Sequence, residues 1–132
     1  MPQVIFAPAD WKIAQATVNL AQAANTYDLL TCSGGAVLID AFSLFCTVVG
    51  ATFTACTIQT DDTVNFVFVD ATAGARANFV ANSNMAITWA QVQKCYLRSG
   101  QKIRYTITGS TGTGTALATV RYMQLSPASV LA

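Results

Sequence analysis

The segment SGQKIRYTIT, residues 99–108, contains the most regular strand pattern in this 132-residue chain. A tight turn at residues 99–101 leads into a stretch where Ile103, Tyr105 and Ile107 alternate with polar residues. Successive side chains of a strand point to opposite faces, so this alternation indicates one apolar face and one polar face. It predicts a half-buried β-strand whose polar face meets solvent or a partner.

Similar short patterns, separated by turn residues, occupy most of the chain. The predicted strands are residues 14–20, 27–32, 37–49, 53–60, 64–69, 86–89, 94–97, 102–108 and 116–125. Residues 71–84 are rich in Ala and Asn, so we expect a loop between sheets or one helical turn there. About eight strands at this spacing predict an all-β fold, a jelly-roll-like β-sandwich.

The length fits one domain with an extended segment at each end. We expect an extended N-terminal arm at residues 1–12, a single sandwich domain at 13–125 and a C-terminal tail at 126–132. Both ends are apolar, and short apolar arms pack on their own domain or on a neighbour. The candidate interface residues in these ends are Val4, Ile5, Phe6, Trp11, Val130 and Leu131.

The composition argues against catalysis. The chain has no His and no Glu, only 10% of its residues are charged, and 53% are hydrophobic. Most enzymatic proton transfers use His, Glu, Asp, Cys or Lys, and here the carboxylates are six Asp. The adjacent Asp61 and Asp62 are typical of a turn rather than of a metal site. We therefore expect no enzyme, no cofactor and no metal, and a surface that is covered by partners.

The four cysteines, Cys32, Cys46, Cys56 and Cys95, lack the paired spacing of a zinc site. They are also too few for a secreted disulfide scaffold. We expect reduced, mostly buried thiols that act as small hydrophobic residues.

Residues 41–60 carry no charge, and this stretch is about as long as a membrane-spanning helix. Their Thr, Val and Phe content and a turn at Gly50 favour two strands instead, and the flanking charges are Asp rather than Lys or Arg. The first residues lack the basic region of a secretory signal. We therefore expect no membrane span, and synthesis and folding in the cytoplasm.

Four basic residues near the end of the chain are expected to cluster, with tyrosines interleaved among them: Arg98, Lys102, Arg104 and Arg121. Nucleic-acid stacking platforms need aromatic and basic side chains on one surface, but Tyr105 alternates with the basic residues of its strand. The net charge of +1 is also low for a phosphate binder. We expect no nucleic-acid binding and take Arg98, Lys102 and Arg104 as further candidate interface residues.

Several segments together resemble one known family. The stretch LRSGQKIRYTITG (97–109), with TGTA (113–116) and TVRY (119–122), resembles the closing hairpin of small jelly-roll structural proteins of tailed bacteriophages. The opening segments VNL (18–20), ANTYDLL (24–30) and GGAVLI (34–39) are similar to theirs. The resemblance implies a capsid decoration, or cement, protein on the outer surface of the virion, made in the host cytoplasm.

That family role implies the major capsid protein as partner. A decoration protein stabilises the shell by binding across subunit joints, and we expect self-association into a dimer or trimer that matches capsid symmetry. The main alternative is a tail or fibre module that binds a host glycan. Trp11, Trp89 and Tyr27 are of the type that stacks on sugars, although Trp89 also fits a core position.

Overall fold

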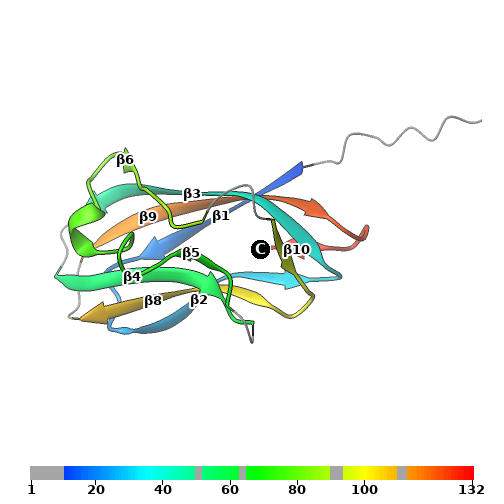
Figure 1. Cartoon of the computed structure of the whole chain (residues 1–132), viewed down its shortest axis with the longest axis horizontal. Coiled ribbons are helices and arrows are strands. Elements are labelled where there is room, and N and C mark those ends of the chain that lie inside the picture. The colour runs from blue at the N-terminus through cyan, green and yellow to red at the C-terminus, as the bar shows by residue number, and fades with distance from the viewer. Residues whose placement is uncertain (1–10, 50–51, 63–64, 90–93, 110–112) are drawn as a thin grey trace, which may run out of the picture.

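The computed structural model describes residues 11–49, 52–62, 65–89, 94–109 and 113–132 (Figure 1). Nearly all of its regular structure is β. The strands are β1 (Trp11–Asn19), β2 (Asn25–Ser33), β3 (Val37–Val49), β4 (Phe53–Thr60), β5 (Val67–Val69), β6 (Ser83–Asn84), β7 (Cys95–Leu97), β8 (Lys102–Gly109), β9 (Gly114–Gln124) and β10 (Val130–Leu131). One short 3-10 helix, η1 (Arg76–Asn78), precedes β6.

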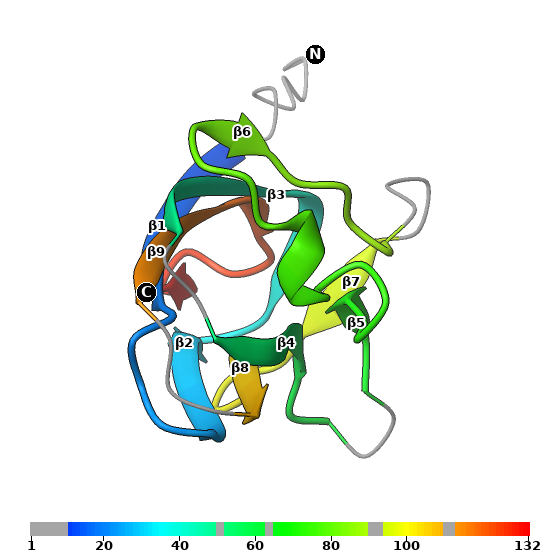
Figure 2. The ribbon, with the colours of Figure 1, turned by 90° about the vertical axis from the view of Figure 1, so that its left-hand side faces the viewer.

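The strands form two antiparallel sheets that face each other (Figure 2). The first sheet has the order β1-β9-β3-β6, and β7 also pairs with β3. The second sheet has the order β10-β2-β8-β4-β5. The prediction of an all-β sandwich is confirmed.

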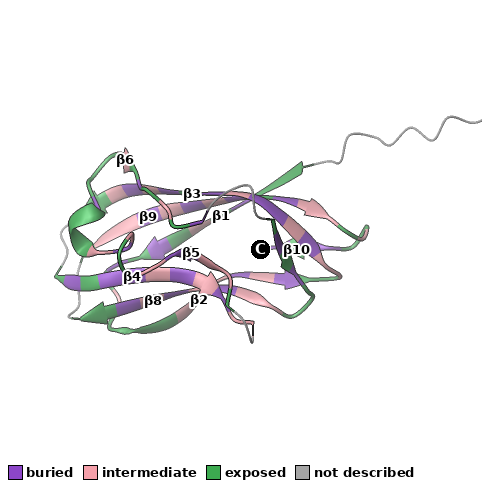
Figure 3. Cartoon of the chain, viewed as in Figure 1, coloured by how far each residue is buried: buried purple, intermediate pink, exposed green. Residues whose placement is uncertain are grey.

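Buried residues occur along the strands of both sheets (Figure 3), and their side chains form one hydrophobic core between the sheets. Ile103, Tyr105 and Ile107 of β8 point inwards, as the alternation in the sequence predicts. Phe42 from the first sheet stacks on Phe68 from the second, with ring centroids 4.7 Å apart. This aromatic contact joins the two layers directly.

Strand β3 contains apolar residues at both odd and even positions because two β-bulges shift its alternation. The register against β9 changes between Ile39 and Ala41 and again between Cys46 and Val48. Each extra residue resets which positions face inwards. As a result Ile39 and Phe42 both point into the core, although they lie three positions apart.

The predicted strand at residues 86–89 is wrong. The structure gives no strand there, and the backbone N–H groups of Thr88 and Trp89 both donate to the Phe68 carbonyl, at 2.9 and 3.1 Å. This irregular segment turns Trp89 into the core, where its ring meets Phe68 edge to face at 5.3 Å. The apolar content of the segment therefore reflects burial of a loop, not a strand.

Other boundaries also differ from the sequence-based ones. The strand predicted at 64–69 is only Val67–Val69, and residue 64 lies outside the described residues. The segment 71–84 contains turns, η1 and the short strand β6, which agrees with the predicted loop or helical turn.

The predicted N-terminal arm and C-terminal tail both contribute described residues to the sheets. Strand β1 begins at Trp11, so the last two residues of the predicted arm belong to the first sheet. At the other end β10 pairs with β2, and Leu131 is only 3% exposed. The C-terminal tail is therefore part of the sandwich.

All four cysteines are buried free thiols, as predicted. Desolvation raises the pKa of Cys56 and of Cys95 to about 12. Within the described residues, the structure contains no helix long and apolar enough to span a membrane.

Replacing Phe42 with Ala tests the contact between the layers. Because Phe42 is fully buried and stacks on Phe68, we expect Phe42→Ala to lower the free energy of unfolding by about 3–5 kcal/mol in urea titrations. Val48→Ala, at an exposed position of the same strand, should change it by less than about 0.5 kcal/mol. Equal losses in the two variants would contradict this packing.

Candidate interaction surfaces

Asp40 is the extra residue of the first bulge in β3, and its carboxylate is buried. The side chain is only 8% exposed and is bound by both Lys94 and Arg121. The hydrogen bond from Lys94 has the largest effect on the pKa of Asp40, followed by the hydrogen bond from Arg121. Both lower this pKa below its ordinary value of 3.8. A buried carboxylate requires such pairing, because an unpaired charge loses its hydration.

Trp11 joins this group from the edge of the sheet. The Arg121 guanidinium lies 5.1 Å from the centre of the Trp11 ring, within the range of a cation–π contact. We call Trp11, Asp40, Lys94 and Arg121 the Asp40 cluster. It ties β1, β9 and β3 together with the residue that precedes β7.

Next to this cluster, four large apolar side chains line up across the outer face of the first sheet. The register places Trp11 opposite Met123, Met123 opposite Leu38, and Leu38 opposite Tyr96. Trp11 is 41% exposed and Tyr96 57% exposed, whereas Met123 and Leu38 are half-buried. We call these four residues the apolar row, which is one continuous hydrophobic stripe across β1, β9, β3 and β7.

A shallow depression borders the apolar row. It has a volume of about 320 Å³ and is lined by Ile13, Ala41, Phe42, Ser43, Thr119 and Arg121. Its lining combines apolar, hydroxyl and guanidinium groups, so the outer face of the first sheet is indented beside the apolar row.

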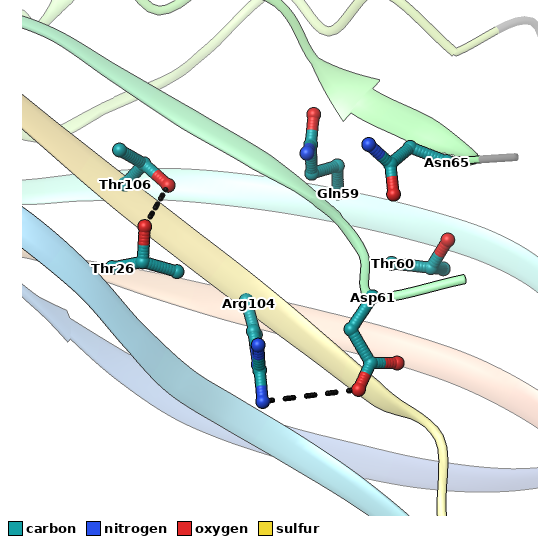
Figure 4. A pocket seen from close by; sticks show the side chains of 7 residues that line it. All are labelled: Thr26, Gln59, Thr60, Asp61, Asn65, Arg104 and Thr106. Carbon is teal, nitrogen blue, oxygen red and sulfur yellow. Dashed lines mark hydrogen bonds and ion pairs between the residues drawn. The ribbon is translucent and has the colours of Figure 1, made fainter. Parts of the chain in front are cut away.

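The outer face of the second sheet has the opposite character. A depression of about 260 Å³ lies across β2, β8 and β4 (Figure 4), lined by Thr26, Gln59, Thr60, Asp61, Asn65, Arg104 and Thr106. Every lining side chain is polar. The Thr26 and Thr106 hydroxyls are 2.8 Å apart, and Arg104 lies 3.9 Å from Asp61.

The expected cluster of four basic residues is wrong, because Arg121 lies on β9 of the first sheet and binds Asp40. The other three, which were predicted as interface residues, are each paired with an acid. Lys102 and Arg104 bind the two oxygens of Asp28 at 2.7 and 3.0 Å. Arg98 lies 3.5 Å from Asp62. The hydrogen bond from Lys102 is the largest cause that lowers the pKa of Asp28. The charges of the second sheet therefore largely neutralise one another.

Of the remaining predicted interface residues, only Val130 lies on the same sheet face as these cations, because its partner Ser33 and the Lys102 partner Thr31 point to one face of β2. Trp11 lies on the first sheet, Val130 is 41% exposed on β10, and Leu131 is buried in the core. Val4, Ile5 and Phe6 lie outside the described residues. The predicted set thus divides between the two sheets and the core.

Asp61 and Asp62 contact different partners. An Asp61 carboxylate oxygen accepts a hydrogen bond from the Lys102 backbone N–H at 2.7 Å, while Asp62 faces Arg98. In the described part of the chain, no group of three acidic, Cys or His side chains is arranged to hold a metal ion. The geometry agrees with the interpretation of this pair as turn residues.

The sequence analysis missed the apolar row. Its four members come from four strands that are far apart in the chain, and only the register of the sheet brings them together. The single local signal is Asp40, a charged residue within an apolar strand, which marks the bulge beside the row.

Comparisons with protein-family models, with curated proteins and with solved structures found no significant match to this chain.

Replacing Asp40 with Asn tests the buried charge pairing. A carboxyl group whose pKa is lowered by folding stabilises the folded state above its unfolded-state pKa, and this contribution disappears as the pH falls through the folded pKa. We expect Asp40→Asn to be less stable than the natural chain at neutral pH, with the difference shrinking once the pH drops below 3.8. Urea titrations over a pH series measure this.

Asp28→Asn is the matched control, because Asp28 also binds two cations but is half exposed. Ion pairs in contact with water contribute little to stability, so its loss at neutral pH should be the smaller of the two. An Asp40→Asn variant as stable as the natural chain at neutral pH would show that the buried pairing is not stabilising.

Proposed function

We propose that this chain is a non-enzymatic structural protein of a virion, a capsid decoration or cement protein that binds the outer surface of the major capsid shell. The apolar row is the observation that carries the proposal. Four large apolar side chains in register on a sheet face, two of them well exposed, form the kind of surface that binds a protein partner.

The order of the strands supports the jelly-roll form of the sandwich that the family resemblance implies. The long strands β1, β3 and β9 lie in one sheet, and β2, β4 and β8 lie in the other. The chain therefore crosses between the sheets at each step from β1 to β4 and again from β8 to β9, whereas β4 and β8 pair within one sheet. The first and last long strands, β1 and β9, are neighbours. Double-sheet jelly rolls are common in viral capsids.

The chemistry of the described side chains supports a binding role over catalysis. The buried thiols are poor nucleophiles, because desolvation raises their pKa, most clearly for Cys56 and Cys95. Asp28, Asp40 and Asp61 each contact at least one cation. A cement protein needs none of these groups as reagents, since it acts by adding binding free energy to the assembled shell.

Self-association into a dimer or trimer belongs to this proposal. Closed oligomers match the symmetry axes of a shell, and several copies of the apolar row on one oligomer would raise its avidity for the capsid.

A test uses capsids that lack the decoration protein. We expect the purified protein to pellet with them saturably and to raise their resistance to heat. Trp11→Ser with Tyr96→Ser should weaken binding about tenfold or more, because aromatic residues at the centre of an interface dominate its affinity. The measurement is the bound fraction in co-sedimentation across a concentration series.

Val80→Ser is the matched control, since Val80 is an exposed apolar residue between η1 and β6, outside the row. It should bind as the natural chain does. Failure of the natural chain to pellet, or equal weakening by the control, would contradict the proposed role of the row.

The depression of the second sheet favours one alternative function, a tail or fibre module that binds a host glycan. Hydroxyl, amide, carboxylate and guanidinium groups converge there, and the acids and bases around it balance. Such a set suits a neutral ligand rich in hydroxyl groups. Among the aromatics considered from the sequence, Trp89 is buried in the core and none lines this depression.

A glycan-array screen tests the alternative. If this site binds a glycan, Asn65→Ala and Gln59→Ala should each reduce the signal about tenfold, because each removes hydrogen bonds to the ligand. Thr54→Ala, an exposed position of β4 outside the depression, should leave the signal unchanged. An array without binding removes this alternative and leaves the capsid proposal untouched.

A further inference from the structure

The four sheet edges of this sandwich differ in how well they are protected. Unpaired edge strands can add a strand from another molecule, so proteins shorten, bulge or cover them. The outer strands β5, β6, β7 and β10 are only two or three residues long. Strand β1 is different, because it is a nine-residue edge strand that pairs on one side only, with β9, among the described residues.

The usual protective devices are missing from β1. Its register with β9 runs from Trp11 to Asn19 without a shift, so it has no bulge. It contains no Pro, and Lys12 is its one charged residue. The open part of β2, on the same side of the sandwich, provides a contrast, since it has a bulge after Asp28 and the charge of Asp28 itself.

The hydrogen bonding shows which backbone groups of β1 are open. The Leu20 N–H donates to the Gly114 carbonyl at 3.0 Å, in the same register as the β1–β9 ladder. Bonded pairs alternate along an antiparallel ladder, so the even-numbered residues of β1 bond to β9. The odd-numbered residues Trp11, Ile13, Gln15 and Thr17 turn their N–H and C=O groups towards the open edge, whereas the Asn19 N–H donates to the Tyr105 hydroxyl of the same molecule.

We propose that β1 pairs antiparallel with β1 of a second copy, across a two-fold axis at Gln15, so that the first sheets of the two copies become continuous. This proposal deepens the self-association suggested above by naming its interface, and it does not depend on capsid binding. The pairing satisfies the open N–H and C=O groups of both copies at once.

The side chains of β1 fit a second copy in this register. Lys12 lies opposite Val18 of the partner subunit, so no like charges face each other. The small residues Ala14 and Ala16 lie opposite each other across the joint, which permits close approach of the two backbones. On the outer face Ile13 meets Thr17 of the partner subunit, a pairing of residues that both favour strands.

The composition of the segment that precedes β1 also favours a second copy of the chain as the partner at this edge. Ten residues come before Trp11, among them Val4, Ile5 and Phe6, and they enter β1 at its first residue. Short apolar segments are expected to pack on their own domain or on a neighbour, and a second copy paired through β1 supplies such a neighbour.

Sedimentation velocity across a dilution series tests the proposal. We expect the natural chain to be a dimer that dissociates on dilution. Gln15→Pro removes one of the outward N–H groups without removing a bond to β9, so it should weaken the dimer about tenfold or more while the far-ultraviolet circular dichroism stays unchanged. Gln15→Lys with Thr17→Lys should act likewise, by placing like charges at the joint without altering the backbone.

Leu38→Ser with Tyr96→Ser is the control, because both residues lie in the apolar row and away from β1. It should remain a dimer, although we expect weaker capsid binding. A natural chain that is monomeric at every concentration, or a dimer that survives both changes in β1, would overturn the proposal. Capsid pelleting of the natural chain is scored separately, so failure of the capsid role and failure of the dimer are distinguishable.

Discussion

The bulge at Asp40 is the constraint on which much of this structure depends. Strand β3 lies at the centre of the first sheet, paired with β9 on one side and with β6 and β7 on the other. The extra residue resets the alternation, so Ile39 on one side of the bulge and Phe42 on the other both reach the core. It also leaves a carboxylate in a buried position, and Lys94 and Arg121 must come to it. One inserted residue thus determines both the packing of the central strand and the position of the Asp40 cluster on the outer face of the first sheet.

The outer faces of the two sheets differ in how their charged and apolar side chains are distributed. On the second sheet, acids and bases alternate across neighbouring strands and pair with each other, as Asp28 does with Lys102 and Arg104. Such pairs contribute little to stability, yet they keep the face hydrated and discourage association. On the outer face of the first sheet, charged side chains meet in the Asp40 cluster, and the apolar row lies beside it. This asymmetry is the basis for proposing a protein partner at the first sheet and, as the alternative, a polar ligand at the second.

The alternation of apolar and polar residues along the chain made much of the fold predictable. Features that depend on how the strands align with one another could not be predicted. The strand 102–108 could be assigned with its inward residues because each of its side chains obeys the period of two. Residues 86–89 have the same apolar content, but there the irregular backbone bonds to Phe68 and the segment is no strand. Neither bulge of β3 leaves a local signature beyond Asp40, and the apolar row exists only once four strands are aligned. For the same reason Arg98, Lys102 and Arg104 looked like a free basic group, since their acidic partners lie far away in the sequence.

Symmetry connects the open edge of β1 with the apolar row. Residues that lie directly opposite each other in an antiparallel pair point to the same face of the sheet. A dimer joined through β1 would therefore present the outer faces of both first sheets on one side, each with its own row. Trp11 belongs to β1 and to the row at once, so the joint and the rows are adjacent. Two rows held rigidly on one face would bind a repeating surface more tightly than one, because the second contact is intramolecular once the first has formed. A repeating surface is what a capsid offers, and the second sheet, with its paired charges, would then face away from it into solvent.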